Sequence, residues 1–351
     1  MGSAVSESSI VAETAARIFA DLADPQEINR AKDGAWKEPL WQALSEAGLT
    51  LAWVPEEQGG AGAELADGFA VLGVAGRYAA TVPLAETLLA GWLLSRAGLK
   101  APEGAMSVAP ARPTDRITLN ADGALSGQAR GVPFAKDAKH LAVLAEGSVA
   151  LVETKACRVN EGINLASEPY NTVTFDKVKP LAIGKAGIDH TALMLMGCVM
   201  RSVQIAGALQ AVLDFTVRYS NERVAFERPI AKFQAVQHNL ARLAGEVSAA
   251  MTAAHSAADA ISRGGRFDDA IFLEATAAKI RSAEAAQEGA AIAHQVHGAI
   301  GFTNEHILHR YTLRMLAWRD DFGNESHWAA ALGNKIAARG AEDFWPLVAA
   351  R

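Results

Sequence analysis

The chain has 351 residues, half of them hydrophobic, which is enough for two or three domains with a sizeable buried core. Lysine and arginine number 33 against 39 aspartate and glutamate, a formal net charge of −6, so composition gives no reason to expect binding to nucleic acid or to a membrane surface. The two cysteines, Cys157 and Cys198, lie far apart and match no metal-ligand spacing, which argues against a disulfide framework or a zinc site and favours a reducing cytoplasm.

Helical patterns fill the first hundred residues. Amphipathic spacing predicts helices over 10–22 and 36–47, and the alanine- and leucine-rich stretch 66–97 predicts a helix that is broken near Pro83. A glycine-rich loop at 58–62 separates them. The first residues contain no basic region followed by an apolar stretch, and no run of about 18 apolar residues predicts a membrane span.

The pattern changes in the middle of the chain. Short segments rich in aliphatic and β-branched residues, separated by Gly, Asp, Asn or Pro, predict a small antiparallel β domain with strands near 116–120, 141–145, 149–152 and 172–175. After Pro180 the long helical patterns return, over 189–219, 233–263, 268–296 and 304–321, with a fifth from Asn324.

This order of patterns predicts an α+β chain in three parts. We expect a helical N-terminal domain over 1–104, a small middle β domain over 105–182 and a C-terminal four-helix bundle over 183–351.

A first candidate ligand-binding segment covers 223–237 and reads RVAFERPIAKFQAVQ. Phe226, Ile230 and Phe233 recur three or four residues apart, which predicts a helical stretch with one apolar stripe. Arg223 lies at its upstream edge, where the guanidinium fork of an arginine suits a diphosphate.

A second candidate segment covers 295–302 and reads QVHGAIGF. Gly298 and Gly301 remove side chains where a helical pattern ends, so backbone N–H groups can approach an anionic or planar ligand closely.

Together the two segments resemble the acyl-CoA dehydrogenase family, whose C-terminal domain carries Arg-x-x-Phe-Gly-x-x-Ile-x-x-Phe-Gln-x-x-Gln and, later, Gln-x-x-Gly-Gly-x-Gly-Phe. The stretch WVPEEQGGAG at 53–62 is similar to the family's N-terminal loop, so the resemblance covers most of the chain. Two positions depart from the pattern, because Glu227 and Ala299 stand where the family usually has glycine.

The resemblance implies an FAD that lies between the β domain and the bundle, with a neighbouring subunit completing its site. It implies that Arg223 reaches the flavin diphosphate and that Gln234 lies at the adenine end. Phe226 belongs to the same motif, and the segment that contacts the cofactor from the partner subunit corresponds to Gln295, Val296, His297, Gly298 and Ala299. An acyl-CoA substrate, electron-transfer flavoprotein as acceptor, and a homotetramer or a heterotetramer with a related subunit follow in the same way.

The chemistry expected of the family is α,β-dehydrogenation, in which a carboxylate removes the α-proton of an acyl-CoA thioester and a hydride leaves to the flavin. Counting from Gly301, the position of the family's usual glutamate falls on Phe322. The second known position lies six residues before the glycine of Ala206-Gly207, and it holds Arg201. A base is therefore missing from both expected places.

The resemblance implies that the chain is itself an FAD-dependent acyl-CoA dehydrogenase, with a partner subunit as the alternative, and three interpretations of the acids stay open. Asp321, or its neighbour Asp320, supplies the base if the loop is displaced by one position, since paired acids raise each other's pKa. In the second, the chain is a non-catalytic or half-site partner subunit, and a related subunit carries the glutamate. In the third, Asp320, Asp321 and Glu325 are solvated acids on a turn, paired with Arg314 or Arg319.

Five of the nine histidines lie between 294 and 327. His306-x-x-His309 lacks the spacing and the internal glutamate of a helical zinc site, so no metal is expected. The resemblance assigns GFTNEH at 301–306 to fold and interface.

Overall fold

Short helices with apolar stripes form the N-terminal part of the computed structural model, which describes residues 10–31 and 34–349. In α1 (Ile10–Leu22), Ala15 and Phe19 lie one turn apart, are fully buried and face α4. The other elements are α2 (Pro25–Ala31), α3 (Lys37–Glu46), η1 (Leu49–Leu51), η2 (Glu56–Gln58), α4 (Leu65–Tyr78) and α5 (Leu84–Arg96). The break expected near Pro83 is confirmed, α2 was not predicted, and the expectation about the first nine residues lies outside the described residues.

Two four-stranded sheets form the middle part, with strand orders β1-β4-β5-β8 and β2-β3-β7-β6. The elements are β1 (Met106–Ala109), β2 (Ile117–Leu119), β3 (Leu125–Pro133), β4 (His140–Ala145), β5 (Ser148–Glu153), η3 (Thr154–Ala156), β6 (Arg158–Asn160), β7 (Tyr170–Val178) and β8 (Ala182–Lys185). The prediction of a purely antiparallel domain is wrong for one pair, because β1 runs parallel to β4 with Met106 opposite His140. The crossover that a parallel pair needs is supplied by β2 and β3.

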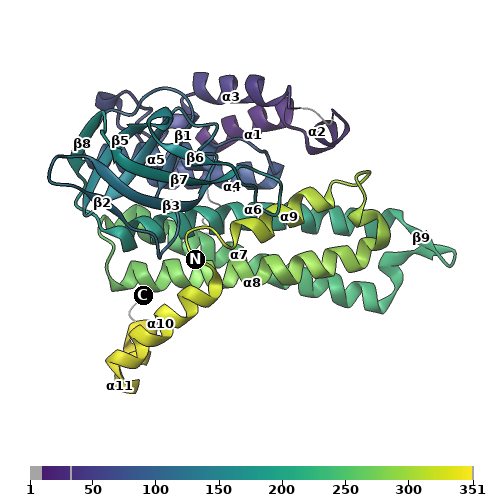
Figure 1. The fold of residues 1–351 in the computed structure, drawn as a ribbon. Coiled ribbons are helices and arrows are strands. Elements are labelled where there is room, and N and C mark those ends of the chain that lie inside the picture. Colours follow the sequence, from purple (N-terminus) through teal and green to yellow (C-terminus); the bar gives the residue numbers. More distant parts are fainter. Residues whose placement is uncertain (1–9, 32–33, 350–351) are drawn as a thin grey trace.

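Long helices form the C-terminal part, which lies along one side of the other two (Figure 1). The elements are α6 (His190–Glu222), β9 (Val224–Ala225), β10 (Arg228–Pro229), η4 (Ile230–Lys232), α7 (Gln234–Gly264), α8 (Asp269–His297), η5 (Gly298–Phe302), α9 (Leu308–Trp318), α10 (Glu325–Arg339) and α11 (Ala341–Ala349). Asp189 and Asp268 cap the first turns of α6 and α8 through their carboxylates. The α+β class and the order of the three parts are confirmed. Helix α10 packs against α8, where Lys335 and Arg339 pair with Asp269, and α11 extends beyond it (Figure 1).

The helix α6 is long and apolar enough to cross a membrane by length and composition. In this structure 94% of its most apolar window is buried inside the protein. A central helix of a folded bundle shows the same composition, because it is covered by other elements on all sides.

Glycines let the backbones of α4 and α6 touch. A Cβ atom added to Gly76 would lie 2.1 Å from the carbonyl oxygen of Gln204, and one added to Gly207 would lie 2.0 Å from that of Gly73. We expect Gly76→Ala to lower the free energy of unfolding by about 2 kcal/mol or more, since the helices must move apart. Gly245→Ala is the matched control: Gly245 is also helical but faces open space, so the substitution should stabilise the chain slightly. Urea denaturation measures both, and equal effects would contradict the close contact.

Candidate active site

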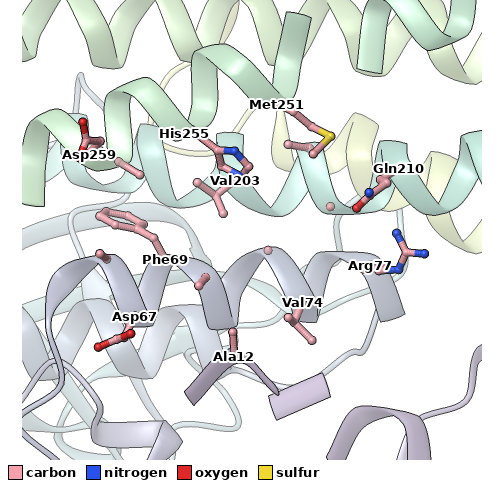
Figure 2. Close-up of a pocket in the computed structure, with 16 residues that line it drawn as sticks. Ala12, Asp67, Phe69, Val74, Arg77, Val203, Gln210, Met251, His255 and Asp259 are labelled. Carbon is pink, nitrogen blue, oxygen red and sulfur yellow. The ribbon is translucent and has the colours of Figure 1, made fainter. Parts of the chain in front are cut away.

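A cavity of about 470 Å³ lies between α4, α6 and α7 and is lined mostly by small apolar side chains (Figure 2). Val74, Val203 and Met251 line its middle, while Asp67 and Asp259 lie toward one end and Arg77 toward the other. None of the residues predicted from the sequence to bind cofactor or to act as a base lines this cavity.

A second cavity, of about 520 Å³, lies where the β part meets the segment after α9, the place at which the family resemblance puts the flavin. Arg112 and Tyr170 line it from the β side, and Asp320 and His327 from the other. Asp321 is not among the residues that line it.

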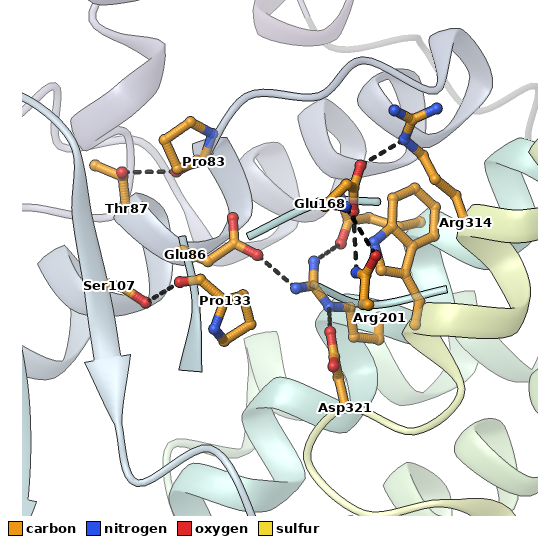
Figure 3. A network of polar contacts seen from close by, with 12 residues as sticks. Pro83, Glu86, Thr87, Ser107, Pro133, Glu168, Arg201, Arg314 and Asp321 are labelled. Atoms are coloured by element: carbon orange, nitrogen blue, oxygen red, sulfur yellow. Dashed lines mark hydrogen bonds and ion pairs between the residues drawn. The ribbon is translucent and has the colours of Figure 1, made fainter. Parts of the chain in front are cut away.

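The predicted base lies instead in a buried network of charges (Figure 3). Arg201 on α6 donates from Nε to Oδ2 of Asp321 over 2.8 Å and from Nη2 to Oε1 of Glu86 on α5. Its Nη1 donates to Oε1 of Gln204 over 2.6 Å. The side chains of Arg201, Glu86 and Asp321 are each 3% exposed, so a single guanidinium pairs with two carboxylates away from water.

A second cation holds the backbone of the same turn. Lys279 on α8 is fully buried and donates from Nζ to the carbonyl oxygens of Trp318 and Asp321, at 2.8 and 2.9 Å. Burial lowers the pKa of Lys279. The turn after α9 is therefore fixed through both its main chain and its acid.

Phe322, at the position of the family's usual glutamate, points into the core. It is 1% exposed and adopts φ of +56°, a left-handed conformation that few non-glycine residues take. Its ring fills the space over Gly197, where a Cβ atom would come within 2.3 Å of it, and its carbonyl oxygen accepts from Nε1 of Trp328 over 3.1 Å. An apolar ring thus occupies the space beside the Arg201 network.

These contacts bear on the three interpretations of the acids. Burial raises the pKa of the Asp321 carboxyl, and Arg201 opposes this; Asp320, named as its neighbour in the first interpretation, is exposed. The third interpretation is wrong for Asp321, which is buried, and for Arg314, which pairs with Glu168 over 2.6 Å. Its pairing is confirmed for Glu325, which binds Arg319, but the Glu325 side chain is only 22% exposed; Asp320 is the acid that is exposed as this interpretation expects.

The segment around Arg223 forms a hairpin, so the helical stretch predicted over this region is wrong. The two strands β9 and β10 are joined by Phe226 and Glu227, with φ of +52° and +66°. Two successive left-handed residues are what a two-residue hairpin turn requires, and they interrupt the helical spacing that the sequence suggested. Glycine would meet the turn at Glu227 without strain, which is consistent with the family's usual residue there.

This hairpin projects from one end of the bundle (Figure 1). Phe226 is 88% exposed and Val224 is 56% exposed. The side chain of Arg223, also exposed, forms no ion pair with any residue in the described part of the chain. Gln234 is the first residue of α7 and is exposed as well.

The second predicted segment lies at the same end of the bundle, because Tyr219 near the end of α6 donates from its hydroxyl to the carbonyl oxygen of His297 over 3.3 Å. The helix α8 ends at His297, and Gly298 follows with φ of +67°, as its predicted role as a helix terminator requires. Gln295, Gly298 and Ala299 are exposed. Val296 and His297 are buried.

The two segments therefore present an unpaired guanidinium, an exposed aromatic ring and an open glycine on one outward-facing surface. An anionic, planar group such as the diphosphate and ring system of FAD fits these donors when it approaches from outside the subunit. Asp321 lies elsewhere, in the turn after α9.

Sequence reasoning missed Glu86 and Lys279. A signal was present, because Glu86 stands in LAETLLAGWLL, an otherwise apolar helix in which a lone acid needs a buried cation. Lys279 likewise stands in an alanine-rich helix, which indicates that this cation is buried and needs polar partners. Across the described residues, no three His, Cys, Asp or Glu side chains are grouped so that they could hold a metal ion.

Comparisons with known proteins bear on the family. The family model of the acyl-CoA dehydrogenase N-terminal domain matches residues 6–102, and that of the C-terminal domain matches residues 190–325. Acyl-CoA dehydrogenase IpdE2 of Mycobacterium tuberculosis is 30% identical over 311 residues, which cover 88% of this chain and 90% of that protein.

Two solved structures share the fold over nearly the whole chain. A variant of the Tcur3481-Tcur3483 steroid ACAD superposes with a TM-score of 0.83 at 26% identity, covering 93% of this chain and 97% of the matched one. The ChsE4-ChsE5 complex from Mycobacterium tuberculosis gives a TM-score of 0.83 at 23% identity, covering 93% and 96%.

Proposed function

Since the chain belongs to the acyl-CoA dehydrogenase family, we propose that it is the half-site partner subunit of a heteromeric, FAD-dependent acyl-CoA dehydrogenase. In this assembly the chain supplies part of the flavin site, and a related subunit supplies the glutamate that removes the α-proton. The names of two structural relatives, each a pair of different chains, support a heteromer over a homotetramer.

The observation that carries the proposal is the buried Arg201 network. A general base must reach the substrate α-carbon within hydrogen-bonding distance, and its carboxylate must be able to take up a proton. Asp321 is 3% exposed and bound to Arg201, while Phe322 fills the neighbouring space, so neither offers an open carboxylate.

The outward-facing residues would hold a flavin bound mainly by the partner. Arg223 would bind the diphosphate, Gln234 would lie at the adenine end, and the exposed backbone at Gly298 would approach the cofactor closely. FAD supplies the acceptor for the hydride when it is bound. The buried ring of His297 and Val296 would hold this segment in place.

We extend the proposal to the other components of the reaction. The substrate of the assembled enzyme is a bulky, steroid-derived acyl-CoA thioester, as the name of one relative suggests, and electron-transfer flavoprotein reoxidises the flavin. A cytoplasmic location is supported by the two cysteines, which are free.

The experiment that tests the proposal expresses the chain alone and together with a related family member that carries the catalytic glutamate. Flavin absorbance and its bleaching by short, long, aromatic, dicarboxylic and steroid-derived acyl-CoA thioesters are measured on both preparations. We expect flavin and bleaching only in the co-expressed assembly. A yellow tetramer of this chain alone that reduces its flavin would show the chain to be a complete dehydrogenase instead.

The variant Asp321→Asn in the same assembly tests the role of that acid. If the partner carries the base, flavin reduction should stay within about twofold of the unmodified enzyme. A loss of roughly a hundredfold, the usual contribution of a general base, would show that Asp321 acts as the base. Asp320→Asn tests the other acid of the first interpretation in the same way, because Asp320 is exposed and lines the second cavity. Asp176→Asn, an exposed acid on β7 outside both cavities, is the matched control.

A further inference from the structure

Four histidines gather where the ends of α6 and α8 meet the start of α9. The ring of His297 stacks on Tyr219 with centroids 4.5 Å apart and lies 4.7 Å from the ring of His306. His294 stacks on Phe302 at 4.1 Å. His309 follows in the first turn of α9 and contacts the carbonyl oxygen of His306. The cluster fixes the segment 294–302 against both neighbouring helices.

Hydrogen-bond partners indicate which ring nitrogens donate and which accept. Nδ1 of His297 lies 2.8 Å from the carbonyl oxygen of Ala293, so it carries the proton, and Nε2 is left as a buried acceptor with no partner. Nδ1 of His309 likewise donates to the carbonyl oxygen of His306 over 2.7 Å.

The other two rings are assigned in the same way. The hydroxyl of Thr312 donates to the carbonyl oxygen of His309, so it accepts from Nε2 of His294 over 2.9 Å and leaves Nδ1 of His294 bare. Nδ1 of His306 accepts from the backbone N–H of Leu308, the first residue of α9, over 3.1 Å. A proton on that nitrogen would break this bond.

The surroundings favour the neutral forms. Burial, followed by repulsion from His297 when that ring is protonated, lowers the pKa of His294. Burial, followed by His297 and Arg218, lowers the pKa of His306 to about 4, and burial also lowers the pKa of His297. The charged groups nearby are Arg218 on α6 and Arg310 on α9, with Glu305 exposed beside His306. Within the described chain, no ion pair joins these four imidazoles to a carboxylate.

We propose that this cluster is a proton-operated latch, in which neutral imidazoles hold the segment 294–302 closed at neutral pH and their protonation in mild acid releases it. The closed form binds fewer protons than the open form, because an exposed histidine has its ordinary pKa. The latch is therefore at full strength above about pH 6.5 and weakens as the pH falls toward the lowered pKa values of the buried histidines. For His306 alone the opening equilibrium should rise roughly tenfold by about pH 5.5.

The consequence for assembly rests on the proposed function, since this segment contains the predicted contacts to the partner's flavin. Mild acid should then release flavin and partner together. Opening of the segment in the full chain can be measured without any partner. The latch can therefore fail while the proposed function holds, and the proposed function can fail while the latch holds.

Hydrogen exchange of the full chain tests the latch, with protection factors corrected for intrinsic rates at about pH 7.5 and about pH 5.5. We expect peptides spanning 292–302 to lose protection by roughly tenfold or more, while peptides from the middle of α7 stay within about twofold. In His306→Asn the side-chain amide oxygen replaces Nδ1 as acceptor for the backbone N–H of Leu308, but it does not titrate. The loss of protection between the two pH values should therefore be about tenfold smaller than in the unmodified chain.

A second variant and a control make the test decisive. His297→Asn keeps a donor to the carbonyl oxygen of Ala293 and should also reduce the loss of protection in acid. This variant decides the test if His306→Asn opens the segment at every pH. His238→Asn, on the exposed face of α7, should change nothing. Unchanged protection in the unmodified chain, or an undiminished loss in both cluster variants, would overturn the latch.

Discussion

Replacing Arg201 with methionine should lower the free energy of unfolding by about 3–5 kcal/mol, as the loss of one partner from a buried ion pair usually does. Glu86 and Asp321 would be left without their cation in a site where each side chain is 3% exposed. Methionine is shorter than arginine but close to it in volume and flexible, so lost charge rather than lost volume dominates the effect. Urea denaturation of the full chain, followed by circular dichroism, measures it.

Two comparisons make this result specific. Arg263→Met removes an exposed ion pair with Asp259 on α7 and should leave the unfolding curve unchanged within error, because surface pairs contribute little. The triple variant with Glu86→Gln and Asp321→Asn added to Arg201→Met should recover much of the loss, since both carboxylates are then removed and the remaining buried cation, Lys279, keeps its two backbone carbonyl acceptors. If Arg201→Met is as stable as the Arg263 variant, the network is not what holds these elements together.

Arg223→Ala should lower the affinity of the assembled enzyme for FAD by about 2–3 kcal/mol, roughly thirty- to two-hundred-fold. The reason is that a charge-assisted pair with the diphosphate would be lost, whereas the exposed side chain has no ion pair within the described chain to lose. Dialysis of the purified assembly followed by flavin absorbance measures occupancy. Stability of the chain itself should not change.

Arg242→Ala is the matched control for this experiment. Arg242 is an exposed arginine on α7 that pairs with Glu288, away from the hairpin, so its removal should leave flavin occupancy unchanged. Full flavin retention by the Arg223 variant after exhaustive dialysis would remove Arg223 from the cofactor site. Loss of flavin in both variants would point to damaged assembly instead of a lost contact.

Periodicity predicted the long elements well, because in them one local pattern repeats over many turns. The spacing over 10–22 and 268–296 gave helices whose observed ends agree within one residue, helped by the capping Asp268. It failed at Phe226 and Glu227, where two left-handed residues make a turn although the apolar spacing continues. The parallel pairing of β1 with β4 was also beyond a local pattern, since it joins strands separated by two others.

Candidate site residues could be located from the sequence only where they belong to a recognisable motif. Arg223 and the segment 295–299 were located by resemblance, and the structure brings them to the same end of the bundle through Tyr219. The roles assigned to these residues and to Asp321 stay predictions. Nothing in the sequence showed that Arg201 faces both Glu86 and Asp321, which lie 115 and 120 residues away, because such a contact depends on how three elements pack.

The Arg201 network also acts as a mechanical link between regions that are distant in the chain. Glu86 belongs to the N-terminal part, Arg201 to the first bundle helix and Asp321 to the turn after α9. Moving Arg201 away would leave both buried carboxylates without their cation, and moving Glu86 or Asp321 away would separate that acid from Arg201, so the regions share the cost of separation. The N-terminal helices and the bundle should therefore unfold as one cooperative unit and not as independent domains.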